Sequence, residues 1–105
     1  MSGRRGYCDR MEATLRDWGA LFDALRAEAG AETTRVRLHS AGCAEAFRPR
    51  RDDAERALAA LRKPGTDWSR VAADLEHAVR DLRRVLAWME RGFAGSLAGE
   101  TPRFT

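Results

Sequence analysis

The residues best suited to chemistry in this sequence are His39 and Cys43, which lie four positions apart. On a helix this spacing puts both side chains on one face, where an imidazole and a thiolate form a metal-binding or nucleophilic pair. A metal site needs further ligands, and the helix register derived below brings only Glu90 near the pair. We therefore interpret the two residues as a small core thiol beside a boundary histidine.

Other patterns of catalytic chemistry are missing from the sequence. It has no glycine-rich phosphate loop, no nucleophile elbow, no CxxC and no HExxH. The carboxylate pair Asp52 and Asp53 lies among arginines, as expected for solvated ion pairs on a helix surface. We predict no catalytic residue, no metal site and no cofactor, and hence a protein that is not an enzyme; an enzyme or metal carrier using His39 and Cys43 ranks third among the functional hypotheses.

An apolar stripe, called here the first stripe, dominates the N-terminal third of the chain. Its steps alternate between three and four residues, the spacing of a coiled-coil seam, with charged residues on the other faces. The first stripe consists of Cys8, Met11, Leu15, Trp18, Phe22, Leu25 and Ala29.

A second pattern predicts an antiparallel helical hairpin in the rest of the chain. Pro64 and Gly65 end one helix, and Thr66 or Asp67 caps the next. Apolar residues on either side of this turn lie at matching distances from it, as facing residues of a hairpin must. The pairs are Leu61 with Trp68, Leu58 with Val71, Ala54 with Leu75, Phe47 with Leu82, Cys43 with Leu86, Ser40 with Met89 and Val36 with Phe93. Pro49 is expected to kink its helix.

The segment 30–34 leaves two arrangements open. If the chain folds back there, the first stripe closes a monomeric three-helix bundle, with Cys8 facing Ala57 and Cys43 facing Phe22. If the helix continues, it is about 85 Å long and its stripe needs a second chain, which implies an antiparallel homodimer. The stripe keeps its phase across the segment with a stutter, which favours the dimer.

The expected fold class is therefore all-α, with an antiparallel hairpin and an N-terminal coiled-coil helix. The three helical segments are 6–29, 32–62 and 67–95, in a single domain over 1–105 with flexible tails at 1–6 and 96–105. Alanine-rich, highly charged composition agrees with long or bundled helices, since 33% of the 105 residues are charged.

Composition also limits the partners. The net charge is +3, but acids are interleaved with the arginines, which makes nucleic acid an unlikely partner. No apolar run is long enough to span a membrane, and no signal peptide is visible after Arg4 and Arg5. Two cysteines without an export signal fit the cytoplasm.

Three parts of the chain resemble a family of short bacterial coiled-coil proteins, generally described as hypothetical or stress-response proteins. The resemblance covers about residues 7 to 93 and implies a helical, non-enzymatic protein with a link to stress; Pro49 and the His39/Cys43 pair depart from the family's pattern. It is carried by Tyr7 with Met11, Leu15, Trp18, Phe22, Leu25 and Ala29, by Arg51 to Ala54 with Leu58 and Leu61, and by the turn Gly65 to Trp68.

The first stripe is also the predicted site of function. We expect self-association or binding of another helical protein, with five of its residues as the buried interface: Met11, Leu15, Trp18, Phe22 and Leu25. The alternative is a peripheral lipid-binding protein in which the same residues meet a membrane surface. Trp88, one position off its stripe, is expected at the bundle edge, at a second chain or at lipid.

Overall fold

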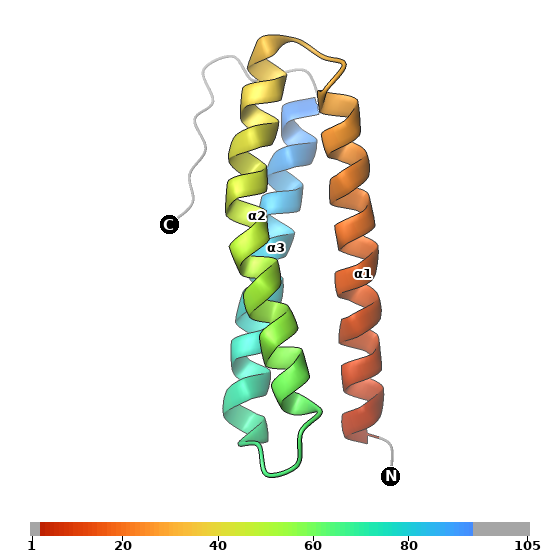
Figure 1. Cartoon of the computed structure of the whole chain (residues 1–105), viewed down its shortest axis with the longest axis vertical. Helices are drawn as coiled ribbons and strands as arrows, with labels where there is room; N and C mark the ends of the chain where they lie inside the picture. Colours follow the sequence, from red (N-terminus) through yellow and green to blue (C-terminus); the bar gives the residue numbers. More distant parts are fainter. Residues whose placement is uncertain (1–2, 94–105) are drawn as a thin grey trace.

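The computed structural model describes residues 3–93, which form three α-helices joined by two short connections. The helices are α1 (Gly3–Ala29), α2 (Thr34–Leu61) and α3 (Trp68–Phe93), and they run alternately up and down in one bundle (Figure 1). No strand occurs within this range. The all-α class, with three helical segments in a bundle, is confirmed.

The hairpin of α2 and α3 forms the centre of the bundle. Its largest fully buried side chains are Phe47, Leu75, Leu82, Met89, Val85 and Cys43. Contacts between His39 and Trp88, and between Arg50 and Asp81, each lie within two positions of the register expected from the spacing. Buried alanines on both helices, including Ala54 and Ala78, let the two backbones approach closely.

The helix α2 continues through Pro49 as a single element, although proline lacks the N–H that a helix interior uses. Pro49 is exposed, so the interruption faces away from the packed side of the helix. Thr33 caps the N-terminus of α2, where its Oγ1 accepts a hydrogen bond from the backbone N–H of Val36 at 3.4 Å.

The chain reverses direction at residues 30–33, so the continuous helix favoured by the phase of the stripe is wrong for this structure. The helix α1 folds back beside the hairpin, and its C-terminal residue Ala29 is buried (Figure 1). Folding back buries the first stripe within one chain, whereas a straight helix would leave it in water unless a second chain covered it.

The register of α1 against α2 differs by about one turn from the one expected for a folded-back chain. Phe22 stacks on Phe47 with the ring centroids 4.1 Å apart, instead of facing Cys43. The observed pair is centred on residues 34–35, two positions later in the sequence than the expected pair of Phe22 with Cys43.

The N-terminal boundary also differs from the expectation. Residues 3–6, expected in a flexible tail, are helical, and the guanidinium carbon of Arg4 lies 4.8 Å from the ring centroid of Trp68. This cation–π contact gives the first turn of α1 something to pack on. The expected C-terminal tail, residues 96–105, lies outside the described residues.

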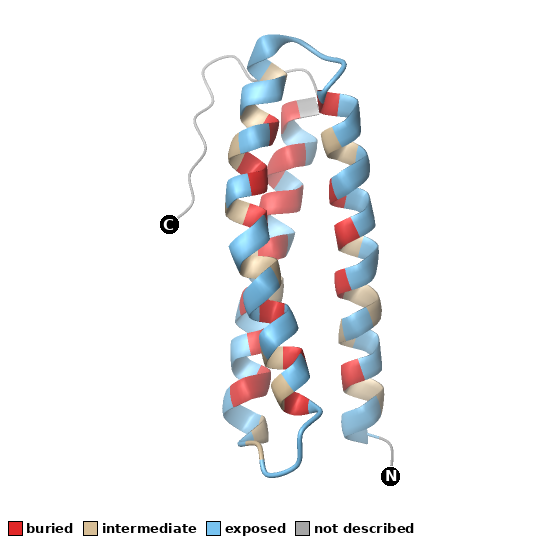
Figure 2. Ribbon diagram, in the orientation of Figure 1, coloured by how far each residue is buried: buried red, intermediate tan, exposed pale blue. Residues whose placement is uncertain are grey.

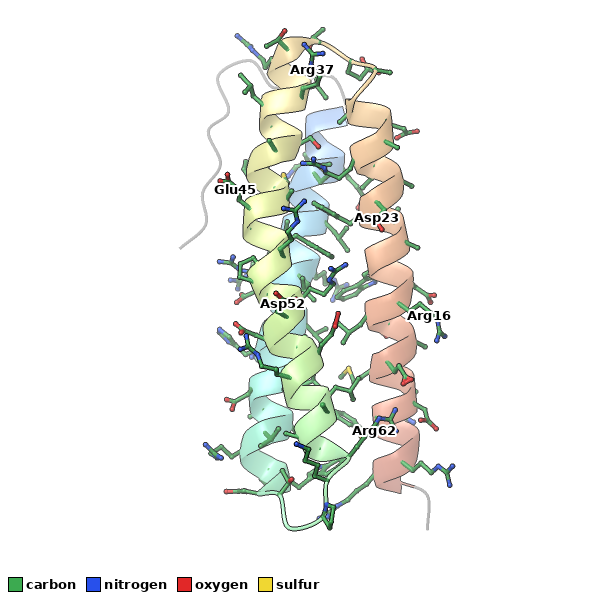
Figure 3. The ribbon with its side chains drawn as sticks, in the orientation of Figure 1. Arg16, Asp23, Arg37, Glu45, Asp52 and Arg62 are labelled. Atoms are coloured by element: carbon green, nitrogen blue, oxygen red, sulfur yellow. The ribbon has the colours of Figure 1, made fainter. Side chains whose placement is uncertain are left out.

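Burial follows the inner faces of the three helices (Figure 2). Charged side chains project from the outer faces, as Arg16 on α1 and Glu45 on α2 show (Figure 3). Two large apolar side chains, Leu21 and Leu38, are exposed, the latter at 69%. The outer surface within residues 3–93 is thus mostly charged, and the apolar stripes are turned inward.

Candidate interaction surface

The five residues predicted as an interface lie on the side of α1 that faces the hairpin. Leu15 and Phe22 are buried there, whereas Met11, Trp18 and Leu25 are only partly buried against the same core. The structure therefore brings the five residues together on one surface. Their partner in this structure is the chain's own hairpin.

The contact between α1 and the hairpin is centred on two aromatic rings. Phe22 and Phe47 lie parallel within 2° and are 4% and 2% exposed. Stacked aromatic pairs add about 0.5–1.5 kcal/mol to the free energy gained by burial alone. This pair is the strongest apolar link between α1 and α2 that the described residues show.

At its N-terminal end α1 is held by aromatic and polar contacts. Tyr7 packs edge-on against Trp68 at 5.7 Å and donates a hydrogen bond from its hydroxyl to Glu76 at 3.1 Å. Burial, together with the hydrogen bond to Glu76, raises the pKa of Tyr7 to about 12. These contacts join α1 to the start of α3.

Arg62, directly after α2, forms ion pairs with two carboxylates of α1. Its Nη2 lies 3.2 Å from Asp9 and 3.2 Å from Glu12, and these contacts raise the pKa of the guanidinium. Near the other end of α1, Arg26 donates a hydrogen bond to the carbonyl of Ser40 at 3.1 Å. Sequence reasoning missed Arg62; its position opposite the start of α1 follows only once the chain is known to fold back.

An open groove separates α1 from α2 along one side of their contact. It holds about 480 Å³, and small residues of α1, Gly19 and Ala20, lie along it with Leu15. Gly19 leaves room for the guanidinium of Arg51, whose Nη1 lies 3.8 Å from the position of an added Cβ. The docking of α1 is therefore incomplete on this side.

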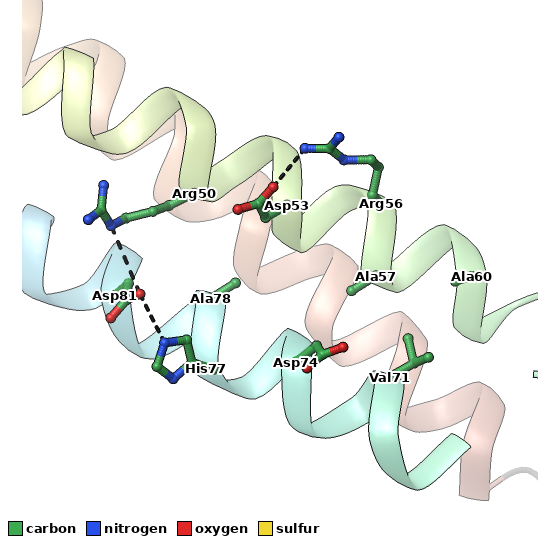
Figure 4. A pocket seen from close by; sticks show the side chains of 10 residues that line it. All are labelled: Arg50, Asp53, Arg56, Ala57, Ala60, Val71, Asp74, His77, Ala78 and Asp81. Atoms are coloured by element: carbon green, nitrogen blue, oxygen red, sulfur yellow. Dashed lines mark hydrogen bonds and ion pairs between the residues drawn. The ribbon is translucent and has the colours of Figure 1, made fainter. Parts of the chain in front are cut away.

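A second groove, between α2 and α3, is formed from small apolar residues with a charged rim (Figure 4). It holds about 490 Å³. Across the rim, Arg50 lies 4.0 Å from Asp81, and the Nε2 of His77 lies 3.5 Å from the same carboxylate. The charges of both signs are thus paired with one another around this groove.

The His39 and Cys43 side chains do meet, but in an arrangement that suits packing. The Nε2 of His39 lies 3.2 Å from the carbonyl oxygen of Trp88 and 3.7 Å from the Sγ of Cys43. Because a carbonyl oxygen only accepts, Nε2 carries the proton in this contact and cannot take one from the thiol. Complete burial raises the pKa of the Cys43 thiol to about 12, which disfavours the thiolate.

Trp88 is buried, and its ring meets that of His39 edge-on with the centroids 4.4 Å apart. Trp88 thus lies inside the bundle against His39, and at none of the three positions expected for it. The hairpin register expected from the sequence places position 39 opposite position 90, within two positions of this contact.

The arginines that could meet phosphates alternate with acids. Arg56 pairs with Asp53 at 2.7 Å, and Arg51 lies 3.6 Å from Glu55. Such exposed pairs contribute little to stability, but they divide the positive charge into short stretches. Across residues 3–93, no group of three or more histidine, cysteine, aspartate or glutamate side chains is arranged to hold a metal ion.

Comparisons with known proteins give no match: no family model, no curated protein and no solved structure corresponds to this chain. In the described part of the chain, no helix combines the length and the apolar character needed to cross a membrane. Arguments about function therefore depend on the geometry of the bundle itself.

Proposed function

We propose that this protein is a non-enzymatic helical interaction protein of the cytoplasm, which acts by helix–helix association through the first stripe of α1. The observation that carries the proposal is the unequal packing of the three helices. The largest fully buried side chains all lie on α2 and α3, whereas the α1 interface residues Met11, Trp18 and Leu25 stay partly exposed.

Fewer contacts hold α1 on the hairpin than hold α2 against α3, and the ion pairs among them lie at the surface. Its ion pairs with Arg62 are exposed, and solvent weakens pairs of that kind. Full burial of Leu15 and Phe22 adds about 1.5–3 kcal/mol each. Detaching α1 therefore requires less free energy than unfolding the bundle, and it exposes an apolar stripe and a matching apolar face on the hairpin.

The chemistry of the site residues supports a non-enzymatic role. The thiol of Cys43 is fully buried and protonated at neutral pH, and His39 is engaged by a backbone carbonyl. Both side chains serve the packing of α2 against α3. The carboxylates of α1 that have partners, Asp9 and Glu12, pair with an arginine on the surface.

A labelled peptide with the sequence of residues 3–29 tests the proposal when it is titrated with the whole protein. Fluorescence anisotropy should rise with protein concentration, because the peptide replaces α1 on the hairpin. A peptide carrying Phe22→Asp should not bind. A peptide carrying Leu21→Asp is the matched control, because Leu21 is the exposed neighbour and its change should leave binding unaltered.

Absence of binding by the unmodified peptide would contradict the proposal, because α1 would then be a permanent part of the core. Vesicles of equal parts phosphatidylcholine and phosphatidylglycerol provide the second arm. Co-flotation of the protein with a blue shift of tryptophan emission, without peptide binding, would favour the lipid-surface alternative.

A further inference from the structure

The two connections of the bundle differ in how firmly their conformation is fixed. In the connection after α2, Gly65 has φ +82, a left-handed conformation that other residues rarely adopt. The hydroxyl of Thr66 donates hydrogen bonds to the carbonyls of Ala60 at 2.6 Å and Lys63 at 3.1 Å. Pro64 adds a fixed φ, so this turn cannot become part of a straight helix.

The connection between α1 and α2 keeps helix-like hydrogen bonds as far as Glu32. The N–H of Gly30 still bonds the carbonyl of Arg26 in the helical pattern, and Ala31 and Glu32 continue with bonds to the third residue back. Positive φ does not occur here, since Gly65 alone has it among the described residues. Thr33 has a helical φ of −62 and an extended ψ of 161, so rotation of its ψ towards about −42° would align α2 with α1.

Two contacts between α1 and α2 share a centre just after this connection, in the first turn of α2. Phe22 meets Phe47, and Asp9 meets Arg62, so both pairs are symmetric about residues 34–36. If two chains straighten their connections and run antiparallel about a two-fold axis at that point, each α1 meets the partner's α2 in the same pairs. The first stripe keeps its phase across the connection, as a straight helix requires.

We infer that the partner of α1 is a second copy of this chain, in a domain-swapped dimer in which residues 3–61 form one helix about 88 Å long and each α1 docks on the other copy's hairpin. This inference rests on the proposed function, because it requires α1 to leave its own hairpin. The swap exchanges the α1–hairpin pairs between two chains and gives up the turn at 30–33 with its long capping bond from Val36 to Thr33. Short connections favour such exchange at high protein concentration.

Thr34→Pro tests the straightened connection. Residue 34 is the first residue of α2, where proline is favoured, and the extended ψ of Thr33 suits the residue before a proline. In the straight helix the same proline lies in the helix interior, where it destabilises the connection in each of the two chains. We therefore expect the association constant of the dimer to fall by about 10⁴-fold. Thr34→Ala is the matched control, because it removes the same hydroxyl and permits both forms.

The measurement is light scattering with size-exclusion chromatography on the whole protein, refolded from urea over a range of concentrations. The unmodified chain and Thr34→Ala should give a species of twice the 11.7 kDa chain mass, and Thr34→Pro only the monomer. A dimer of equal strength in Thr34→Pro would overturn the inference. A monomer in every variant would also overturn it, while binding of the labelled α1 peptide would in that case leave the proposed function standing.

Crosslinking separates a swapped dimer from two closed bundles in contact. Asp9→Cys combined with Arg62→Cys places two exposed thiols where the present ion pair spans 3.2 Å. A short bismaleimide should join two chains in the dimer fraction and give an intrachain link in the monomer fraction. Intrachain links in both fractions would refute the swap. The chain without the introduced cysteines controls for Cys8 and Cys43, which are buried.

Discussion

The aromatic pair between α1 and α2 allows a quantitative test of how α1 is attached. Phe22→Ala and Phe47→Ala each remove a buried ring from the contact between these helices. Replacing a core phenylalanine by alanine lowers the free energy of unfolding by about 3–5 kcal/mol. Phe47 should lie at the upper end of this range, because it also belongs to the closed α2–α3 core.

The two substitutions should not be additive. Each single change removes the stacking interaction, which is worth about 0.5–1.5 kcal/mol, so the double variant cannot lose it twice. The loss in the double variant should therefore be smaller than the sum of the single losses by about that amount. A small domain with about 5–15 kcal/mol of stability tolerates each single change.

Urea unfolding at low protein concentration, followed by circular dichroism and by tryptophan fluorescence, gives the required free energies. Phe22→Ala combined with Leu75→Ala is the control pair, because Leu75 is fully buried on α3 and has no aromatic ring that could stack on Phe22. Those two losses should add within about 0.5 kcal/mol. Equal additivity in both pairs would refute the stacking of Phe22 on Phe47.

Three further predictions concern the turn, the thiol and the surface. Gly65→Ala should lower the free energy of unfolding by about 1 kcal/mol, because Gly65 has a positive φ. Gly42→Ala should raise it by about 0.5–1 kcal/mol, because Gly42 lies in open space within α2. Thermal unfolding of the two variants compares the effects. Ellman's reagent at pH 8 should reach Cys43 only after unfolding. The free energy of unfolding measured with urea should fall as pH rises from about 9 towards 12. The pKa values of Cys43 and Tyr7 are raised in the folded protein, so the unfolded chain releases these protons at lower pH. Arg62→Ala should shift the urea midpoint only slightly, because both of its ion pairs are exposed. A shift as large as that of Phe22→Ala would contradict a surface role for these pairs.

The hairpin could be predicted in detail because its information is local. Pro64 and Gly65 mark the turn, and the apolar residues on either side lie at matching distances from it. Two helices joined by a tight turn have little choice of register when each carries one apolar stripe. The contact of Arg50 with Asp81 fits this expectation within two positions.

Fewer details of the candidate site could be predicted from the sequence. The sequence placed the five predicted interface residues on one face of α1, because their steps alternate between three and four. It did not identify Arg62 or Tyr7, whose contacts join segments far apart in the chain. Trp88 was ambiguous for the same reason, since its burial depends on a side chain from another helix.

The sequence by itself determined that the protein is all-α, where the hairpin turns, and which face of α1 is apolar. Only the tertiary structure decided that α1 folds back on its own hairpin, with Phe22 on Phe47. The physical reason lies in residues 30–33, where Gly30 and Thr33 weaken a helix but no proline or positive φ enforces a turn, so local preference is nearly balanced. When local preference is nearly balanced, the burial of a distant apolar surface decides the direction of the chain.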